Sequence, residues 1–494
     1  MKPQKRAKIF GAMLLLTLST QLIGLFKNTL LAQAFGVGSA MDAYNLANTY
    51  IVAITNLAIP AIIIVLIPVL AKEQKTRYEA SGIDSYITFL IAIITVLIVV
   101  VNIGSFLTVQ FGTLTEEMTL FIEMTCMISV AQVFRVYTSI LTSHRQVADD
   151  FIHPKVATFI SAVVATSYIF FAKSPSILIV MLFLSVSFLV EWLYLLIVNR
   201  GTGFRRRWKL KNRTFQKLIR QTGPVIFNAI IFQVSLIIST TLATFLGNGY
   251  VSAIGYSNQI LSIIQALILV NMLSLSYPTL LRLFKQDLQA AKKQLLGDIE
   301  RTNTLVIPLV VGMMILGKAF TTLLFQRGEF GADDTALVSQ FLIILALSLP
   351  ALVIRDFLYR AFFALDDTKT PSKISLVAII LNIGFLAVFT PMVGIVAVLV
   401  APLIANSFSM LIALRLLQKK IGTLKLGKTI RNHLLIVMNS IVMAVIILFL
   451  NQTRDAPLLI EFSGLTLVGI VVYTILTAIT NPSARTILRM KKGK

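Results

Sequence analysis

The sequence is poor in the residue types on which most enzymes and soluble domains depend. Only 13% of its 494 residues are charged, whereas soluble domains carry about 25%. A single cysteine, Cys126, excludes an internal disulfide and a cysteine-based metal site. The three histidines (His144, His153 and His433) lie beside basic or polar residues, and no HExxH, P-loop or strand-linked GxGxxG motif is present. We therefore expect no catalytic residues, no metal, no cofactor and no enzymatic activity.

Apolar residues and positive charge are what the sequence has in excess. It is 57% hydrophobic, and 44 lysines and arginines against 21 acidic residues give a formal net charge of +23. In a soluble chain this charge would suggest nucleic-acid binding. Here, runs of about 20 apolar residues indicate membrane-spanning helices instead. The opening MKPQKRAK resembles the charged region of a signal peptide, but the long apolar run after it favours an uncleaved first span.

The distribution of apolar runs predicts an all-α membrane protein with fourteen transmembrane helices. The predicted spans are 9–35, 42–70, 84–109, 118–143, 155–172, 176–199, 220–246, 250–281, 302–325, 335–364, 372–390, 393–414, 432–450 and 457–480. With both termini in the cytoplasm, nearly all lysines and arginines outside the spans fall on the cytoplasmic side. Only Lys173, Arg327 and Arg454 fall in outer loops. An error of one span would have broken this alternation, so the pattern supports the count and a plasma-membrane location.

Short motifs recur in the two halves of the sequence. ADDFIHP (148–154) matches LDDTKTP (365–371), and Pro68 in the second span matches Pro278 in the eighth. Both copies keep the same orientation, which predicts two six-helix bundles related by a pseudo-two-fold axis along the membrane normal. The expected domains are a six-helix bundle at 1–199, a linker at 200–219, a second six-helix bundle at 220–418, and two extra helices with a basic tail at 419–494.

The linker at 200–219 is strongly basic, and aromatic and aliphatic residues interrupt its charges. Phe204, Trp208 and Leu210 lie among the lysines and arginines. We interpret it as an amphipathic element that lies against anionic lipid headgroups. Because it joins two membrane spans, this interpretation is favoured over binding of nucleic acid.

Two facing bundles predict a central cleft with alternating access, and Lys27 is a candidate binding residue in it. A charge at the centre of a bilayer costs about 3 kcal/mol or more, so an intramembrane lysine needs a function or a partner. Gln21, Gly24 and Asn28 lie at helical spacing with Lys27 and give one polar face. A lysine suits phosphate as a point charge. The alternative is a purely structural ion pair with Asp42.

Other polar residues within the spans are further candidates for lining the cleft. Most of them are neutral, and any one of them could simply join helices. In span 10, Asp356 and Arg360 stand four residues apart and could pair on one helix face, while Arg360 could also snorkel to the membrane surface. The further candidates for substrate binding are Asp42, Asn45, Thr55, Asn56, Gln259, Arg355 and Arg360.

Several stretches resemble one family. RAFFALDDTKTPSKI (360–374) and LLFQRGEFGADDT (323–335) are similar to segments of the MurJ/MviN family, and LIGLFKNTLLAQAFGVGSAMDAY (22–44) is consistent with them. These are the bacterial lipid II flippases of the multidrug/oligosaccharidyl-lipid/polysaccharide exporter superfamily. The resemblance implies fourteen spans, a cationic cleft for the pyrophosphate and sugars, and a hydrophobic groove for the lipid tail beside the last two spans.

The resemblance also implies roles for individual positions. Lys27 and Gln21 stand where the family has arginine, Asn28 where it often has aspartate, and Asp42 matches the family's aspartate. Three departures reduce the charge of the cleft, because neutral residues replace expected arginines. These are Thr55, Asn56 and Gln259.

The leading interpretation is therefore a flippase that moves undecaprenyl-diphosphate-linked peptidoglycan precursor to the outer leaflet. The expected partners are this lipid-linked oligosaccharide, membrane lipids and a coupling ion, with the protein acting as a monomer. A flippase for a capsule, exopolysaccharide or teichuronic-type repeat unit is the first alternative, favoured by the missing arginines. A cation-coupled drug antiporter and a scaffold without transport activity are weaker alternatives. A channel is disfavoured because no filter signature is visible.

Overall fold

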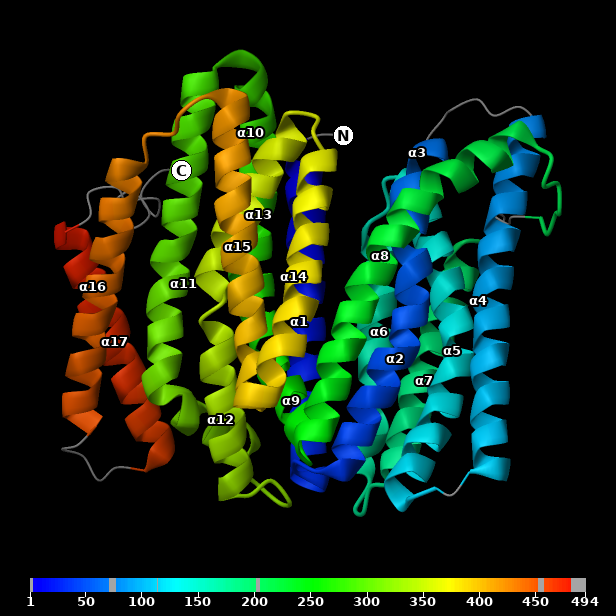
Figure 1. Ribbon diagram of the computed structural model, residues 1–494, viewed down its shortest axis with the longest axis horizontal. Helices are drawn as coiled ribbons and strands as arrows, with labels where there is room; N and C mark the ends of the chain where they lie inside the picture. Colours follow the sequence, from blue (N-terminus) through cyan, green and yellow to red (C-terminus); the bar gives the residue numbers. More distant parts are fainter. Residues whose placement is uncertain (1–2, 71–76, 113, 201–204, 452–456, 481–494) are drawn as a thin grey trace. The chain divides into compact units, whose positions relative to one another are not determined.

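The computed structural model describes residues 3–70, 77–112, 114–200, 205–451 and 457–480, and these residues are almost entirely helical, with no strand. The predicted basic tail (481–494) and residues 201–204 of the predicted linker lie outside the described residues. The elements, shown in Figure 1, are α1 (Pro3–Phe35), α2 (Ser39–Ala61), η1 (Ile62–Leu66), α3 (Ile67–Leu70), α4 (Arg77–Phe111), α5 (Glu116–Val147), α6 (Ile152–Phe171), α7 (Ile177–Val198), α8 (Arg213–Leu246), α9 (Tyr250–Ile264), η2 (Gln265–Val270), α10 (Asn271–Gln286), α11 (Leu288–Phe325), α12 (Ala332–Ala346), α13 (Leu349–Ala364), α14 (Lys369–Val393), α15 (Ile395–Ile421), α16 (Leu426–Asn451) and α17 (Leu458–Thr480).

The predicted all-α membrane class is confirmed. Within the described residues, 13 helices are long and apolar enough to cross a membrane. They do not include the predicted span 42–70, where α2, the π-helical turn η1 and α3 follow one another without a break. The count of fourteen spans therefore stays a prediction. Continuous helices are the expected form, because a helix satisfies every backbone N–H and C=O within lipid.

Polar side chains fix where several helices begin. Thr115 accepts a hydrogen bond from the backbone N–H of Met118 at the start of α5. Asn212 does the same for two N–H groups at the start of α8, and Asp287 for two at the start of α11. The first N–H groups of a helix have no partner within the helix, so such caps stabilise the start by about 1 kcal/mol each. Helix α8 thus begins at Arg213, inside the segment predicted as linker.

The chain divides into two compact units, Met1–Ser252 and Ala253–Lys494, and the division falls within α9. In the first unit, α2 and α7 pack on α5, α6 packs on α1 and α7, and α8 packs on α2 and α4. One of its apolar cores includes Tyr86, whose hydroxyl is 2.6 Å from that of Thr222. In the second unit, α11 packs on α12, α13, α16 and α17. The predicted domain limits, a six-helix bundle on each side of a linker, stay a prediction.

The repeated motifs adopt the same turn in both units. Asp149 and Asp366 have φ angles of 59° and 57°, and they are the non-glycine residues with positive φ in the described part of the chain. The next residue caps the following helix in each case: Asp150 accepts from the N–H of His153, and Asp367 accepts from that of Thr370. Aspartate tolerates the left-handed conformation better than most residues, which explains the Asp-Asp pair in both copies.

Candidate functional site

A cavity of about 370 Å³ lies in the first unit, among five helices. Helices α1, α2, α5, α6 and α7 each contribute to its wall. Hydroxyl groups form much of the lining, from Thr20, Thr138, Ser139, Thr158, Ser161, Thr166 and Ser187. Such a wall can donate and accept hydrogen bonds, as a sugar or phosphate ligand requires.

Three charged side chains line the same cavity. Lys27 comes from the last third of α1, Arg135 from α5 and Glu191 from α7. The cavity therefore carries two cations and one carboxylate. Its lining charges favour an anionic ligand, because low-dielectric walls strengthen the field of an uncompensated cation.

Lys27 is half-buried, and its ammonium group lies 3.4 Å from the hydroxyl of Tyr44, to which it donates. None of the ion pairs found among the described residues includes Lys27. A structural pair with Asp42 was the alternative to a binding role, and it is not formed. The phenol hydroxyl is neutral, so it leaves the positive charge of Lys27 available to an anion.

Asp42 instead joins two turns of the backbone. It is 5% exposed, and its carboxylate oxygens accept hydrogen bonds of 2.7 Å from the N–H groups of Gly249 and Ser252. These donors lie at the start of α9, where the helix dipole favours a negative charge. The two turns also touch, since a Cβ atom on Gly249 would lie 2.6 Å from a methyl carbon of Val37. Asp42 thus has a structural role in the first unit.

Arg135 is the charged residue that sequence reasoning undervalued. Its guanidinium donates to the side chains of Gln132 (3.1 Å) and Thr55 (3.4 Å), and it lies 5.0 Å from the ring centre of Phe188. The structure therefore brings a cation from α5 next to Thr55, one of the positions where the resemblance implied arginine on span 2. An arginine within a predicted span was the available signal. Its orientation could not be deduced, because it depends on packing between α2 and α5.

The other sequence-predicted residues are divided between the units. Gln21, Asn28, Asn45 and Asn56 are half-buried on α1 and α2 and are not part of the cavity wall. Gln259 lies half-buried on α9 in the second unit.

The predicted contact between Asp356 and Arg360 is not found among the ion pairs of the described residues. Asp356 is paired with its neighbour Arg355 at 2.7 Å, and Arg355 also donates to Asn406. Arg360 lies over the ring of Tyr277, 5.4 Å from its centre. Arg355 thus contacts a side chain of α15, and Arg360 contacts one of α10. The spacing of residues along α13 could not predict these contacts between helices.

An apolar cavity of about 500 Å³ lies in the second unit against α11, α16 and α17. Pro308, Met443, Ile447 and Phe462 are among its lining residues. Helices α16 and α17 come close at Gly469, where a Cβ atom would lie 2.9 Å from Ile447. The cavity lies beside the last two helices, where the resemblance implied a groove for a lipid tail. Its lining suits a hydrocarbon chain.

Among the described residues, no group of three or more histidine, cysteine, aspartate or glutamate side chains could hold a metal ion.

Comparisons with known proteins point to one family. The family model described as "Lipid II flippase MurJ" matches residues 31–469. The "Probable lipid II flippase MurJ" of Rhizobium meliloti (strain 1021) is 24% identical over 432 residues, covering 82% of this chain and 78% of that protein. The protein of the same description from Rhizobium tropici is 24% identical over 466 residues, covering 90% of this chain and 86% of the relative.

Solved structures show the same fold. "Lipid II flippase MurJ, inward closed conformation" superposes with a TM-score of 0.81 at 20% identity, covering 97% of this chain and 99% of the other. An inward-facing multidrug resistance MATE family transporter superposes with a TM-score of 0.65 at 14% identity, covering 84% and 99% of the two chains. The lower score places the drug transporter farther from this fold.

Proposed function

Because the chain belongs to the lipid II flippase MurJ family, we propose that it moves undecaprenyl-diphosphate-linked peptidoglycan precursor from the cytoplasmic to the outer leaflet. The observation that carries the proposal is Lys27, a membrane-embedded cation that lines a hydroxyl-rich cavity and takes no carboxylate partner among the described residues. A lipid diphosphate supplies the compensating negative charge. The sugar and peptide part requires the many hydrogen-bonding groups that such a wall offers.

In this proposal, different parts of the chain meet different parts of the substrate. Lys27 binds a phosphate, and Arg135 adds a second positive charge to the same cavity. Gln21, Asn28, Asn45 and Asn56 extend the polar path along α1 and α2, and Asp42 holds the turn that positions it. In the second unit, Gln259, Arg355 and Arg360 are the corresponding proposed contacts. The apolar cavity beside α16 and α17 accepts isoprenoid carbon atoms.

The transport cycle is the finer part of the proposal. Two bundles related by an axis along the membrane normal would rock against each other and expose the polar path to each leaflet in turn, as in other repeat-based transporters. Both termini lie in the cytoplasm of a bacterial cell, the working unit is a monomer, and a coupling ion drives the cycle. Hydrolysis by the chain itself is not required, in keeping with a family of transporters rather than catalysts.

Another polyprenyl-linked oligosaccharide is the second candidate substrate. Thr55 and Asn56 are neutral, and Thr55 is fully buried against Gln132, so α2 adds no cation at this level. A cavity with fewer arginines would hold a diphosphate less tightly, because lysine lacks the planar fork of arginine. Arg135 offsets part of this loss by reaching Thr55 from α5.

Complementation tests the proposed substrate. In a bacterium depleted of its own lipid II flippase, we expect the unmodified protein to restore growth and the appearance of lipid II at the outer leaflet. Lys27→Ala should abolish this rescue, and Lys27→Arg should retain it, because the charge is kept. Lys318→Ala is the matched control, since Lys318 is an exposed lysine of α11 that lines neither cavity described above.

The outcomes separate the candidates. Rescue by Lys27→Ala at the normal level would remove Lys27 from the mechanism. If the unmodified protein is inserted in the membrane and yet fails to rescue, the second candidate substrate is favoured over lipid II.

A further inference from the structure

Residues 205–212, which precede α8, are fixed to α4 by hydrogen bonds. The backbone N–H groups of Arg205, Arg207 and Lys209 donate to the side chains of Asp84 (3.2 Å), Thr88 (3.3 Å) and Ser85 (3.0 Å). The segment ends where Asn212 donates to Tyr78 and Ser81 and begins α8. We call residues 205–212 the basic strap. Because these bonds already hold its backbone, binding of a ligand does not have to order the backbone of the strap.

The strap fits closely against α4 at one glycine. A Cβ atom on Gly82 would lie 2.5 Å from the amide oxygen of Asn212 and 2.7 Å from the Cβ atom of Thr214. The absence of a side chain there lets the start of α8 approach α4. The strap therefore packs on α4 within the first unit, a contact that the predicted amphipathic linker against lipid headgroups did not include.

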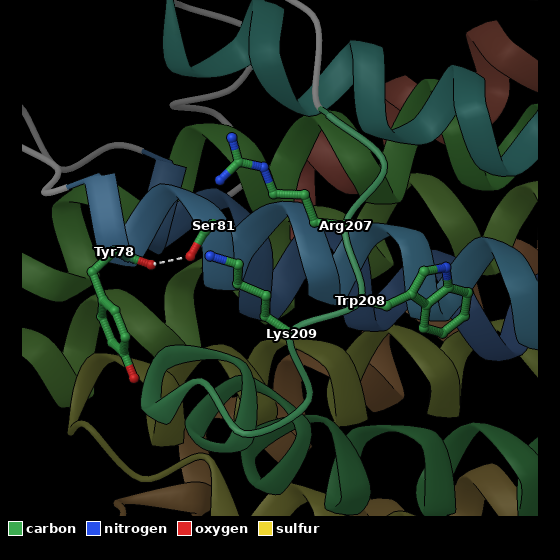
Figure 2. Close-up of a pocket in the computed structure, with 5 residues that line it drawn as sticks. All are labelled: Tyr78, Ser81, Arg207, Trp208 and Lys209. Carbon is green, nitrogen blue, oxygen red and sulfur yellow. Dashed lines mark hydrogen bonds between the residues drawn. The ribbon is translucent and has the colours of Figure 1, made fainter.

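At residues 207–209 of the strap, the charged and apolar side chains lie on opposite sides (Figure 2). In an extended chain, side chains two residues apart point to the same side. Figure 2 shows Arg207 and Lys209 extending toward Tyr78 and Ser81, and Trp208 extending in the opposite direction. These five residues line a pocket of about 750 Å³. Its size lies within the range of about 300–1,000 Å³ that is usual for small-molecule sites.

The pocket carries positive charge that the described residues only partly compensate. Arg207 meets Asp84 through its Nε atom at 3.7 Å, while its two Nη nitrogens have no partner among the described residues. The ammonium group of Lys209 also has none among them. A forked guanidinium next to an ammonium is the donor set that binds a phosphate well. The pocket thus matches a phosphate ester in both size and charge.

Apolar side chains beside the pocket identify the source of the phosphate. Trp208 is 60% exposed, Leu210 49% and Tyr78 53%. Tryptophan and tyrosine favour the headgroup level of a bilayer, and basic segments at the ends of spans attract anionic lipids of the cytoplasmic leaflet. A soluble phosphate would not need this apolar edge. We propose that the strap and α4 form a binding site for the phosphate of an anionic membrane phospholipid, separate from the transport cavity.

Quenching of Trp208 by brominated lipid tests this site in the full-length protein. Trp192→Phe leaves Trp208 as the remaining tryptophan of the two in the chain. The protein is reconstituted in phosphatidylcholine nanodiscs with rising fractions of brominated phosphatidylglycerol. We expect half-maximal quenching at a much lower fraction than with brominated phosphatidylcholine. Lys209→Gln should raise that fraction about fivefold, and Arg207→Gln with Lys209→Gln about twentyfold.

A control variant that loses the same number of positive charges distinguishes a specific lipid site from general attraction to the positive charge of the strap. Arg206→Gln with Lys211→Gln removes two exposed charges of the same strap that do not line the pocket. We expect this variant to stay within about threefold of the parent, because screened charges act weakly on a bound headgroup.

Three results would overturn the proposal. One is an equal effect of the two double variants, and another is equal quenching by the two brominated lipids. The third is displacement of the lipid by millimolar glycerol phosphate, which would assign the pocket to soluble phosphate. If the double variant misfolds, Lys209→Gln alone still tests the site, because it keeps the backbone hydrogen bond to Ser85.

Discussion

At the scale of single residues, opposite charges share the cavity of the first unit without direct contact. Arg135 is held by Gln132, Thr55 and Phe188, and Glu191 accepts a 3.5 Å hydrogen bond from Thr158. The described residues form no direct ion pair between Arg135 and Glu191. Each charge still offsets the cost of burying the other, because attraction in a low-dielectric interior extends beyond contact distance.

This arrangement predicts coupling between the two residues. Arg135→Gln and Glu191→Gln should each lower the free energy of unfolding by about 3 kcal/mol, since each leaves one buried charge uncompensated. The double variant should lose less than the sum, with a coupling of about 1–3 kcal/mol. Unfolding of the four proteins in detergent measures this coupling. Additive losses would show that the two charges act independently.

At the scale of elements, the repeated Asp-Asp turns are tied to neighbouring helix ends. Arg145 pairs with Asp150 in the first unit at 3.3 Å, and Lys420 at the end of α15 pairs with Asp367 in the second at 2.8 Å. Arg145 also donates to the carbonyl of Val198 at the end of α7. In each repeat, a cationic side chain therefore forms an ion pair with the Asp-Asp turn. The cation belongs to α5 in the first unit and to α15 in the second.

The second turn predicts a pH-dependent contribution to stability. Partial burial alone would raise the pKa of Asp367, but hydrogen bonds from Lys420 and Thr370 outweigh it and hold that pKa at about 2, below its ordinary value of 3.8. A carboxylate whose pKa is lower in the folded than in the unfolded state stabilises the fold at pH values above the unfolded pKa. This stabilisation is lost as the pH falls toward the folded pKa. The contribution should be complete above about pH 4 and lost between pH 4 and 2.

Asp367→Asn tests this contribution by chemical unfolding of the protein in detergent. We expect a loss of about 1 kcal/mol at pH 7, since Lys420 is 40% exposed and solvent screens the pair. The difference between variant and parent should shrink as pH falls through the same window. Asp366→Asn is the control, because Asp366 is exposed and asparagine also tolerates its positive φ. A difference that persists unchanged at pH 2 would contradict the assignment.

At the scale of the whole molecule, Asp42 connects parts of the chain that are far apart in sequence. Its bond to Gly249 spans 207 residues and closes the first unit around the turns before α2 and α9. Gly249 has a φ of 83° and contacts Val37, so it has little room for a side chain. A buried carboxylate with two backbone donors holds such a junction firmly.

Asp42→Ala should therefore lower stability more than substrate affinity. It leaves two buried N–H groups without acceptors, at a cost of about 2 kcal/mol or more. Asp42→Asn should be intermediate, since one acceptor oxygen remains. Thermal unfolding and lipid II binding, measured on the same purified samples, separate the effects. Asn45→Ala, one turn along α2, is the control for stability alone, with little expected loss of it. Normal stability with lost binding would make Asp42 a direct substrate ligand.

The sequence by itself determined the helical membrane class and the repeated turns, and it identified Lys27 as a candidate binding residue. These features are local: apolar runs of helix length, a motif at constant spacing, and a charge where lipid would not tolerate one. Only the tertiary structure decided that Asp42 bonds to Gly249 rather than Lys27, that Arg135 reaches Thr55, and that the basic strap lies along α4. Each of these contacts joins residues tens to hundreds of positions apart. Hydropathy fixes which segments become helices, but the partner of a polar side chain depends on which helix faces pack together.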